Sequence, residues 1–153
     1  MINEKDNKIL NILQKNSRIS NAEIARQIKM APSAFFERIK GLEKKKIIKR
    51  YTIQVDPEII GKDLLAFVHV RANGPVVDQK TARELARIPE VQEVHIVAGE
   101  DCFLIKVRAK NTGELTKLLR TKIASIPSIS STSTTIVLET LKEVNDLVTE
   151  YRD

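Results

Sequence analysis

The sequence contains a single cysteine, Cys102, among its 153 residues. One thiol excludes an internal disulfide and cannot form a cysteine-based metal site by itself, so we expect Cys102 to be a small, buried strand residue. The two histidines show no spacing typical of a catalytic His/Cys or His/Asp pair or of a metal site. No glycine-rich loop is present that would bind phosphate. We therefore expect no metal, no cofactor and no catalytic residues.

Long hydrophobic runs are also absent. Apolar stretches such as Leu64–Val70 and Cys102–Val107 are far shorter than the roughly 20 residues that a membrane span needs. The N-terminus has no apolar segment of the kind found in signal peptides. The sequence therefore predicts a cytoplasmic protein with no membrane partner.

The charge is distributed unevenly along the chain. Residues 1–50 contain 13 of the 26 Lys and Arg residues but 5 of the 20 Asp and Glu residues, a net charge of +8, while residues 51–153 carry −2. This asymmetry is typical of a chain in which one segment faces a polyanion. By charge alone, nucleic acid and an anionic membrane surface are the two obvious polyanions; the helix pattern that follows favours nucleic acid, in keeping with the expectation of no membrane partner.

Apolar spacing predicts three helices in the first third of the chain. The first covers about residues 4–15 and the second about residues 21–28. Ser20 is expected to cap the second helix, with Glu23 three residues later completing a capping box. The third helix is expected to begin at Pro32, because proline suits a first helical turn.

The third helix has two distinct sides. Its core side is predicted to carry Phe35, Ile39 and Leu42 at i, i+4 and i+7. The opposite side is predicted to carry Ser33, Phe36, Glu37, Lys40 and Lys44. Two short helices with a tight connection, the second exposing small polar and basic groups, fit the major groove of DNA. For Phe36 we favour packing in the core or an interface over contact with a thymine methyl group.

A basic segment follows, in which helical spacing gives way to β-branched residues. It is expected to form a wing along DNA phosphates, with binding that weakens steeply with salt. The predicted DNA contacts outside the exposed helix side are Arg38, Lys45, Lys46, Lys49 and Arg50. A second hypothesis for Arg38 is an ion pair with Asp6 that braces the first helix against the third. Residues 1–52 thus form the predicted winged helix-turn-helix domain.

The remainder of the chain is predicted as a linker strand at residues 53–62 and an α/β domain at residues 63–153. Strands are expected at about residues 64–71, 91–97, 103–109 and 129–138, and helices at about 78–88, 111–125 and 141–151. The order is β-α-β written twice. The fold class is therefore α+β, with a ferredoxin-like βαββαβ domain that leaves one sheet face for a second copy of the chain.

Several short motifs are distributed along nearly the whole chain. In the N-terminal third they are residues 6–10 (DNKIL), 23–25 (EIA) and 38–43 (RIKGLE), with Ile48 and Tyr51. In the remainder they are residues 88–91 (IPEV) and 98–101 (AGED), with Thr134 in the last strand. None of them is diagnostic alone, but in their order and spacing the motifs resemble the Lrp/AsnC family of feast/famine regulators.

The resemblance implies a sequence-specific transcription regulator that binds double-stranded DNA, with a RAM-type effector domain and no enzyme activity. It implies a homodimer that assembles further, for example into an octamer, and a small effector, such as an amino acid, bound near Gly99, Glu100, Asp101 and Thr134. Three positions depart from the family pattern: Ala31 replaces a capping serine, Lys46 replaces a glycine and Cys102 replaces an aspartate. Asp101 lies one place before that aspartate position.

Two alternatives remain open at this point. Siroheme decarboxylases have a similar two-domain architecture. If this chain were such an enzyme, His69 and His95 would be the residues expected to hold the tetrapyrrole. A DNA-packaging protein without sequence preference would also account for the basic N-terminal third. Colour of the purified protein tests the first alternative, and competition with random DNA tests the second.

Overall fold

The structure, a computed structural model, describes residues 2–73, 79–99, 103–147 and 149. The chain forms two compact units, one of Met1–Gln54 with Lys142–Asp153 and one of Val55–Leu141. The end of the chain from Lys142 onward therefore groups with the N-terminal helices, whereas the sequence predicts one domain over residues 63–153. Within the described ranges, no helix is both long and apolar enough to cross a membrane.

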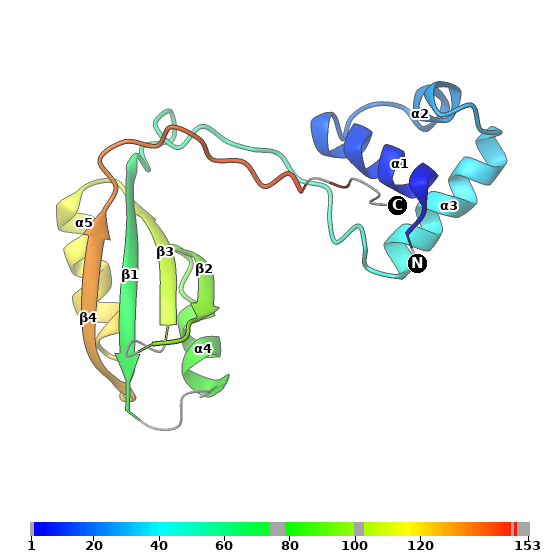
Figure 1. Ribbon diagram of the computed structural model, residues 1–153. Coiled ribbons are helices and arrows are strands. Elements are labelled where there is room, and N and C mark those ends of the chain that lie inside the picture. The colour runs from blue at the N-terminus through cyan, green and yellow to red at the C-terminus, as the bar shows by residue number, and fades with distance from the viewer. Residues whose placement is uncertain (1, 74–78, 100–102, 148, 150–153) are drawn as a thin grey trace. The chain divides into compact units, whose positions relative to one another are not determined.

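Three helices form the N-terminal unit: α1 (Glu4–Lys15), α2 (Asn21–Gln27) and α3 (Pro32–Lys44) (Figure 1). The predicted cap of α2 is confirmed, because Ser20 Oγ accepts a hydrogen bond from the backbone N–H of Glu23 at 3.2 Å. The predicted return bond from Glu23 is wrong. Its carboxylate instead accepts a bond from Arg26 Nη2 at 2.7 Å, since an arginine one turn further on is in easy reach.

The helices enclose a small apolar core. Its buried members are Ile9, Ile24, Ala25, Phe35, Ile39 and Leu42. The predicted inward side of α3 is therefore confirmed. Ile47 and Ile48, directly after α3, pack against the same core.

The predicted basic wing contains no strand. Residues 45–56, all of which the structure describes, form turns and unpaired chain after α3. The backbone N–H groups of Ile47 and Ile48 both donate to the carbonyl of Leu42, at 2.9 and 3.3 Å. These bonds close the end of the helix, so the two N–H groups are not free to join a β ladder.

The predicted linker strand is also wrong. None of residues 53–62, which are all described, belongs to a strand. Asp56 Oδ1 accepts hydrogen bonds from the backbone N–H groups of Glu58 and Ile59, at 2.9 and 3.4 Å, and thereby folds the segment into a turn. Gly61 completes the turn with φ at +68°, a conformation that favours glycine.

The second unit has the predicted ferredoxin-like order. Its elements are β1 (Leu64–Ala72), α4 (Gln79–Ala86), β2 (Val91–Ile96), β3 (Phe103–Ala109), α5 (Thr112–Leu118) with the π-helical turn η1 (Leu119–Ile123), and β4 (Ile129–Ile136). The antiparallel strands lie in the order β2-β3-β1-β4. The α+β fold class is confirmed.

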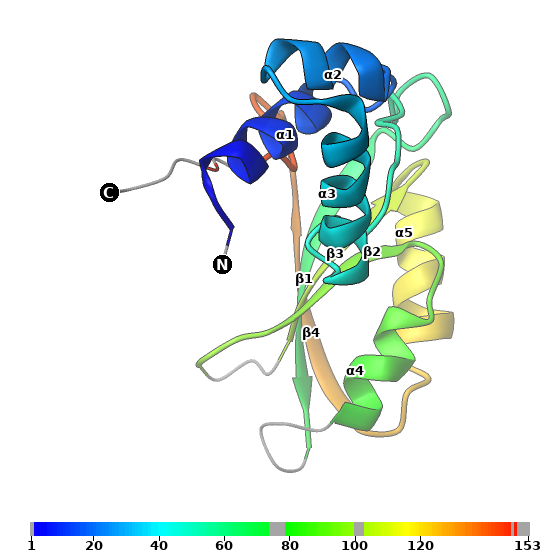
Figure 2. The same ribbon diagram turned by 90° about the vertical axis from the view of Figure 1, so that its right-hand side faces the viewer.

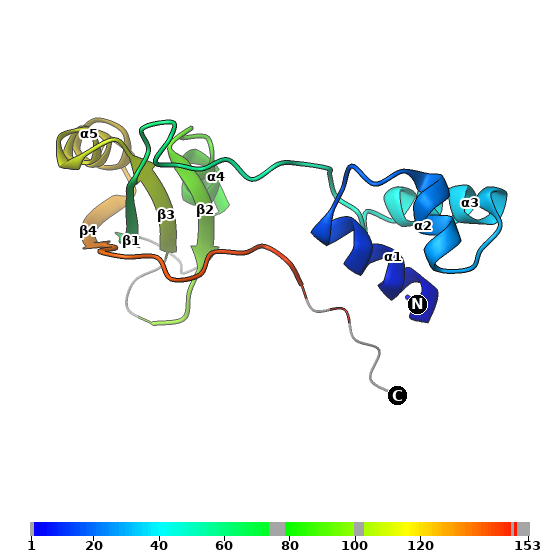
Figure 3. The ribbon, with the colours of Figure 1, turned by 90° about the horizontal axis from the view of Figure 1, so that it is seen from above.

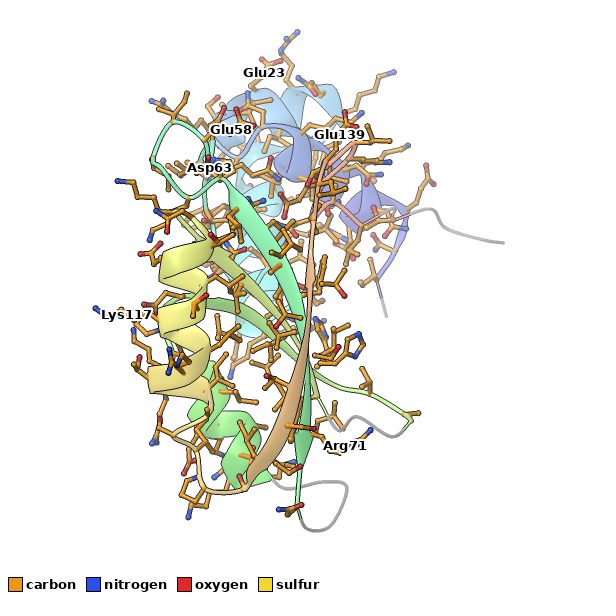
Figure 4. All side chains as sticks on the ribbon, turned by 90° about the vertical axis from the view of Figure 1, so that its left-hand side faces the viewer. Glu23, Glu58, Asp63, Arg71, Lys117 and Glu139 are labelled. Atoms are coloured by element: carbon orange, nitrogen blue, oxygen red, sulfur yellow. The ribbon has the colours of Figure 1, made fainter. Side chains whose placement is uncertain are left out.

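Both helices of this unit, α4 and α5, cover the same face of the sheet (Figures 2 and 3). Alternate residues of β1 and β3 form the core beneath them, among them Val68, Val70, Ile105 and Val107. Figure 4 shows Lys117 of α5 pointing away from the sheet, and Arg71 of β1 on the side opposite to α5. Within the described part of this unit, no helix covers that second face.

The predicted terminal helix over residues 141–151 is wrong for the residues that the structure describes. Residues 141–147 and residue 149 are not helical. Leu141, Val144 and Leu147 have the spacing of a helix face but are 88%, 54% and 74% exposed. A short helix needs an apolar surface to bury such a face against, and here the face finds none. The backbone N–H and carbonyl of Leu147 instead bond to the side-chain amide of Gln14, at 2.7 and 2.9 Å.

Candidate nucleic-acid interface and effector loop

The outward side of α3 is open along its length. Five side chains predicted to contact DNA are exposed there: Ser33, Phe36, Glu37, Lys40 and Lys44. The helix has 13 residues, which at 1.5 Å per residue makes it about 20 Å long. Its diameter of about 10–12 Å fits the major groove, which is about 12 Å wide.

Phe36 does not pack in the core of the N-terminal unit. It is 47% exposed, so the prediction of core packing is wrong, while packing in an interface between copies stays a prediction. Phe35 occupies the buried position at 1% exposure, and a helix turns adjacent residues about 100° apart, which directs the Phe36 ring outward. The ammonium of Lys40 lies 4.3 Å from the centroid of the Phe36 ring, within the range of a cation–π contact.

Two lysines adopt backbone angles that favour glycine: Lys29 with φ at +51° and Lys46 with φ at +55°. Each follows the C-cap residue of a helix, Ile28 after α2 and Lys45 after α3, and turns the chain so that the helix end is closed by hydrogen bonds. After α3, Ile47 N–H bonds to the Leu42 carbonyl and Lys46 N–H to the Glu43 carbonyl, both at 2.9 Å. This is the Schellman arrangement, in which a left-handed residue satisfies the last carbonyls of the helix. Lys46, which stands where the family has glycine, therefore adopts the positive φ that glycine would adopt more easily.

Five basic side chains at and after the end of α3 are exposed: Lys44, Lys45, Lys46, Lys49 and Arg50. They lie on unpaired chain and at a helix end rather than on a strand. The segment of residues 44–50 is named here the basic segment.

Arg38 is occupied within the N-terminal unit. Its Nη1 donates to Asp6 Oδ1 at 2.8 Å and to Asn3 Oδ1 at 2.9 Å. Asn3 and Asp6 also form the capping box of α1, each side chain accepting from the other backbone N–H at 3.0 Å. The hypothesis of an Asp6–Arg38 ion pair is therefore confirmed, while a DNA contact by Arg38 remains a prediction.

Asn3 was missed by the sequence reasoning. The signal was present, because asparagine three residues before an acidic residue at a helix start is a variant of the capping box. A second omission is the set of polar residues Asn7, Asn11 and Gln14 on α1, which bond to the end of the chain through the Asn7 backbone carbonyl and the Asn11 and Gln14 side chains. Thr149 Oγ1 lies 2.6 Å from Asn11 Oδ1, for example. No local signal could have revealed a partner more than 130 residues away.

We predict that Ala31→Ser stabilises the N-terminal unit. Ala31 is the N-cap of α3 and provides no side-chain hydrogen bond. Serine at an extended N-cap contributes about 1 kcal/mol relative to alanine, by accepting a bond from a free N–H of the first turn. Urea unfolding should show this gain. Ala34→Ser, one turn inside the exposed side of α3, is the control and should give no gain; equal gains from both variants would contradict the prediction.

We predict that Lys46→Gly makes the N-terminal unit more stable but a weaker DNA binder. Relief of the left-handed angle should exceed the entropy cost of glycine by about 0.5–1 kcal/mol, while loss of one phosphate contact should reduce affinity about fivefold at 0.15 M salt. Lys29→Gly is the matched control, since it relieves the same strain outside the basic segment. Thermal unfolding and fluorescence anisotropy measure the two effects. Equal loss of DNA affinity in both variants would contradict the prediction.

Two of the four predicted effector residues, Gly99 and Thr134, belong to opposite edges of the sheet in a single chain. Glu100, Asp101 and Cys102 lie outside the described residues. Gly99 is exposed after β2 with φ at +132°, while Thr134 is exposed on β4, paired with Val68. Because β3 and β1 lie between β2 and β4, strand spacing puts these two edges about 14 Å apart.

A different hollow, of about 190 Å³, lies beside α5 and η1. Charged groups around it neutralise one another: Lys122 Nζ lies 2.6 Å from Glu90 Oε1, and this bond lowers the pKa of the Glu90 carboxyl. Neither Gly99 nor Thr134, the two predicted effector residues that the structure describes, lines it. Among the described residues, no three His, Cys, Asp or Glu side chains are grouped to hold a metal ion.

The two histidines lie on the sheet face that the helices leave open. His69 of β1 and His95 of β2 both pair with Leu104, from opposite sides of β3. His95 Nε2 is 3.1 Å from Glu93 Oε2, and this hydrogen bond lowers the pKa of the Glu93 carboxyl. His95 is therefore one member of a surface polar pair.

Comparison with known proteins covers both units. The winged helix-turn-helix DNA-binding family model matches residues 2–49, and the Lrp/AsnC ligand binding domain model matches residues 65–147. The leucine-responsive regulatory protein of Escherichia coli K12 is 34% identical over 149 residues, which cover 96% of this chain and 91% of that protein.

Solved structures agree with the sequence relatives. Escherichia coli AsnC has a TM-score of 0.85 at 29% identity, covering 94% of this chain and 96% of its own. A feast or famine regulatory protein from M. tuberculosis, solved with L-methionine, has a TM-score of 0.88 at 26% identity and covers 97% of this chain and 99% of its own. These relatives are named as regulators, which favours regulation over the decarboxylase and DNA-packaging alternatives. The chain belongs to the Lrp/AsnC family of DNA-binding transcription regulators.

Proposed function

We propose that this regulator places the exposed side of α3 in the major groove and the basic segment on the adjoining phosphates. The observation that carries the proposal is that α3 has one buried and one exposed side. It buries Phe35, Ile39 and Leu42, while its exposed side ends in lysines. The proposed groove contacts are Ser33, Phe36, Glu37, Lys40 and Lys44, and the proposed phosphate contacts are Lys45, Lys46, Lys49 and Arg50. Because DNA is the partner, the protein is proposed to act in the cytoplasm.

Competition binding tests this function. A labelled DNA fragment from the promoter of the protein's own gene is bound by the full chain at several salt concentrations. Sequence-specific binding should survive a large excess of random duplex, and affinity should fall linearly on a log–log plot against salt. Complete competition by random duplex at equal concentration would contradict a specific regulator and favour DNA packaging.

We propose further that the protein works as a homo-oligomer, at least a dimer and assembling to a higher state such as an octamer. Support comes from the sheet face without helices, where Phe67 and Leu104 are only half-buried, and from Ile96 and Ile136, which are 46% and 42% exposed. Apolar side chains at such positions are best buried by another copy. A dimer also suits two half-sites about one DNA turn apart. Mass measured in solution tests the proposal, and a monomer at micromolar concentration would contradict it.

The proposed effector is an amino acid, recognised near Gly99 by groups from more than one copy. A single small molecule cannot bridge Gly99 and Thr134 within one chain, so joint contact requires two chains. Backbone N–H groups beside a glycine suit a carboxylate, and the acids that follow in the sequence suit an ammonium. Support for the class of ligand comes from the M. tuberculosis relative solved with L-methionine.

We predict that a matched pair of glycine variants separates effector binding from folding. Gly99 and Gly61 both have positive φ, and an added Cβ meets nothing within 4 Å at either. Gly99→Ala and Gly61→Ala therefore both carry a backbone penalty, which is larger at Gly99 because its φ of +132° lies outside the left-handed helical region. Wild type and Gly61→Ala should be stabilised by the cognate amino acid, by about 2.7 kcal/mol at 100 times its Kd. Gly99→Ala should lose most of this gain. Thermal unfolding against the 20 common amino acids measures it; an equal gain in both variants would contradict a site at Gly99.

A further inference from the structure

The exposed phenyl ring of Phe36 is an apolar group on an otherwise polar side of α3. It is 47% exposed, and its neighbours on that side are Ser33, Glu37 and Lys40. The Lys40 ammonium lies over the Phe36 ring, 4.3 Å from its centroid, in a cation–π contact. An apolar ring held toward a polyanion gains nothing from phosphates, so its partner must be an apolar group of the DNA.

The major groove offers one prominent apolar group, the C5-methyl of thymine. The other groups at the base edges there are hydrogen-bond donors and acceptors. A ring on the outward side of the recognition helix is therefore matched to thymine rather than to guanine. Lys40, stacked on the same ring, brings a donor beside that contact.

Glu37 is the second unusual residue of this surface, because a carboxylate repels phosphates. In the described part of the chain it forms no ion pair, and neither does Lys40. A carboxylate at a DNA interface is favourable only opposite a donor, and the cytosine N4 amino group is the base-edge donor that acidic side chains accept from. Elsewhere the repulsion disfavours binding, which adds specificity.

Glu37 and Lys40 are three residues apart on a helix, so their side chains are neighbours. A C·G pair presents the cytosine amino group beside the guanine O6 and N7 acceptors. Glu37 and Lys40 together complement that pattern, because the carboxylate can accept from the cytosine amino group and the ammonium can donate to the guanine acceptors. Along the helix axis, Phe36 and Lys40 are about 6 Å apart, which corresponds to one or two base-pair steps at about 3.4 Å per step.

We propose that Phe36, Glu37 and Lys40 form the specificity-determining element of α3: Phe36 contacts a thymine methyl, and Glu37 with Lys40 contacts a C·G pair one or two steps away. This inference rests on the proposed function, because it requires α3 to lie in the major groove. It adds to that function the bases that each half-site must contain.

Selection from a random duplex library with the full chain is the first part of the test. The enriched motif should contain a thymine within two steps of a C·G pair in each half-site. An enriched motif without that combination overturns the base assignment and leaves the DNA-binding function standing. No enrichment of any sequence contradicts both.

The second part replaces each thymine of the enriched site by deoxyuridine, which removes only the methyl group. At one position, wild-type affinity should fall about fourfold, the change expected from one buried methyl group. Phe36→Ala should bind more weakly and show no response to that replacement. Tyr51→Ala is the matched control, since Tyr51 is also an exposed aromatic residue of this unit, at 51%, and it should keep the wild-type response.

Three results of the second part would overturn the assignment of Phe36. The first is that no position responds to deoxyuridine. The second is that Phe36→Ala responds as strongly as wild type. The third is that Phe36→Ala changes the mass in solution and weakens all sequences equally, which would make Phe36 a contact between copies. Thermal unfolding checks that each variant folds. We expect all of them to fold, because the replaced side chains are exposed.

The C·G assignment has its own variant. Glu37→Gln should raise affinity for random duplex, because one repulsive charge is lost, and should reduce discrimination at the C·G pair roughly tenfold. Glu4→Gln, which removes the same charge from an exposed position of α1, should change neither. Unchanged discrimination in Glu37→Gln would overturn the role of Glu37.

Discussion

Replacement of Arg38 by alanine is expected to lower the free energy of unfolding of the N-terminal unit by about 2–3 kcal/mol. The Asp6 side chain is only 10% exposed and the Arg38 side chain 31%. Without the guanidinium, the Asp6 carboxylate stays largely buried with only the Asn3 N–H as a partner. The bond from Arg38 to Asn3 would be lost as well, so the start of α1 and the middle of α3 would separate. Urea unfolding of the full chain measures the effect.

Arg26→Ala is the matched control for this prediction. Arg26 also pairs with a carboxylate, that of Glu23 at 2.7 Å, but its side chain is 77% exposed. Exposed pairs contribute about 0–1 kcal/mol, so this variant should unfold almost as wild type does. If Arg38→Ala is as stable as wild type and only DNA affinity falls, Arg38 is a DNA contact and the bracing role is wrong.

Neutralising three of the proposed phosphate contacts in the basic segment is expected to reduce DNA affinity about a hundredfold at 0.15 M salt. The variant combines Lys45→Gln, Lys49→Gln and Arg50→Gln, and leaves Lys46 unchanged because of its backbone angle. Each lost phosphate contact removes about 0.9 from the log–log salt slope, so the slope should become shallower by about 2.7. Anisotropy titrations at four or more salt concentrations measure both quantities.

The control variant removes the same charge from exposed positions of the C-terminal unit, Lys110→Gln, Lys117→Gln and Arg120→Gln. Both triple variants lose three positive charges, but counterion release should fall only where cations contact phosphates. The control should therefore keep the wild-type slope. A parallel change of slope in both variants would mean that net charge, rather than the basic segment, governs binding.

The elements that could be predicted from the sequence are those with strong periodicity and local end signals. The three helices of the first unit have apolar spacing, with Ser20 and Pro32 at helix starts, and their bounds agree with the prediction within a residue or so. The four strands alternate or are bounded by turn residues, and an Ile-Pro pair, at residues 88–89 and again at 126–127, lies between each helix and the next strand. Local chemistry was sufficient for these elements.

The incorrect predictions share a physical cause, which is competition from partners outside the local pattern. Ile47 and Ile48 have strand propensity, but their N–H groups close α3. Leu141, Val144 and Leu147 have helix spacing, but the Leu147 backbone bonds to Gln14, at the other end of the chain. The effector residues were grouped by resemblance, while the strand order sets Gly99 and Thr134 at opposite sheet edges.

Phe36 shows the limit of pattern alone for a site residue. The spacing of Phe35, Ile39 and Leu42 placed Phe36 on the outward side of the helix, but spacing alone does not say whether an outward aromatic side chain packs against another part of the protein. The structure buries Phe35 and exposes Phe36. The residue for which core packing was favoured thus becomes the one with the most specific expected role.

Methylation protection of guanine N7 tests most directly whether α3 lies in the major groove. N7 lies in that groove, so dimethyl sulfate treatment of a selected fragment bound by the full chain reports its occupancy base by base. We expect protected guanines in two segments about 10 base pairs apart, with protection lost in Lys40→Met. Full reactivity of every guanine in a bound fragment, or uniform protection along its whole length, would contradict sequence-specific binding through α3.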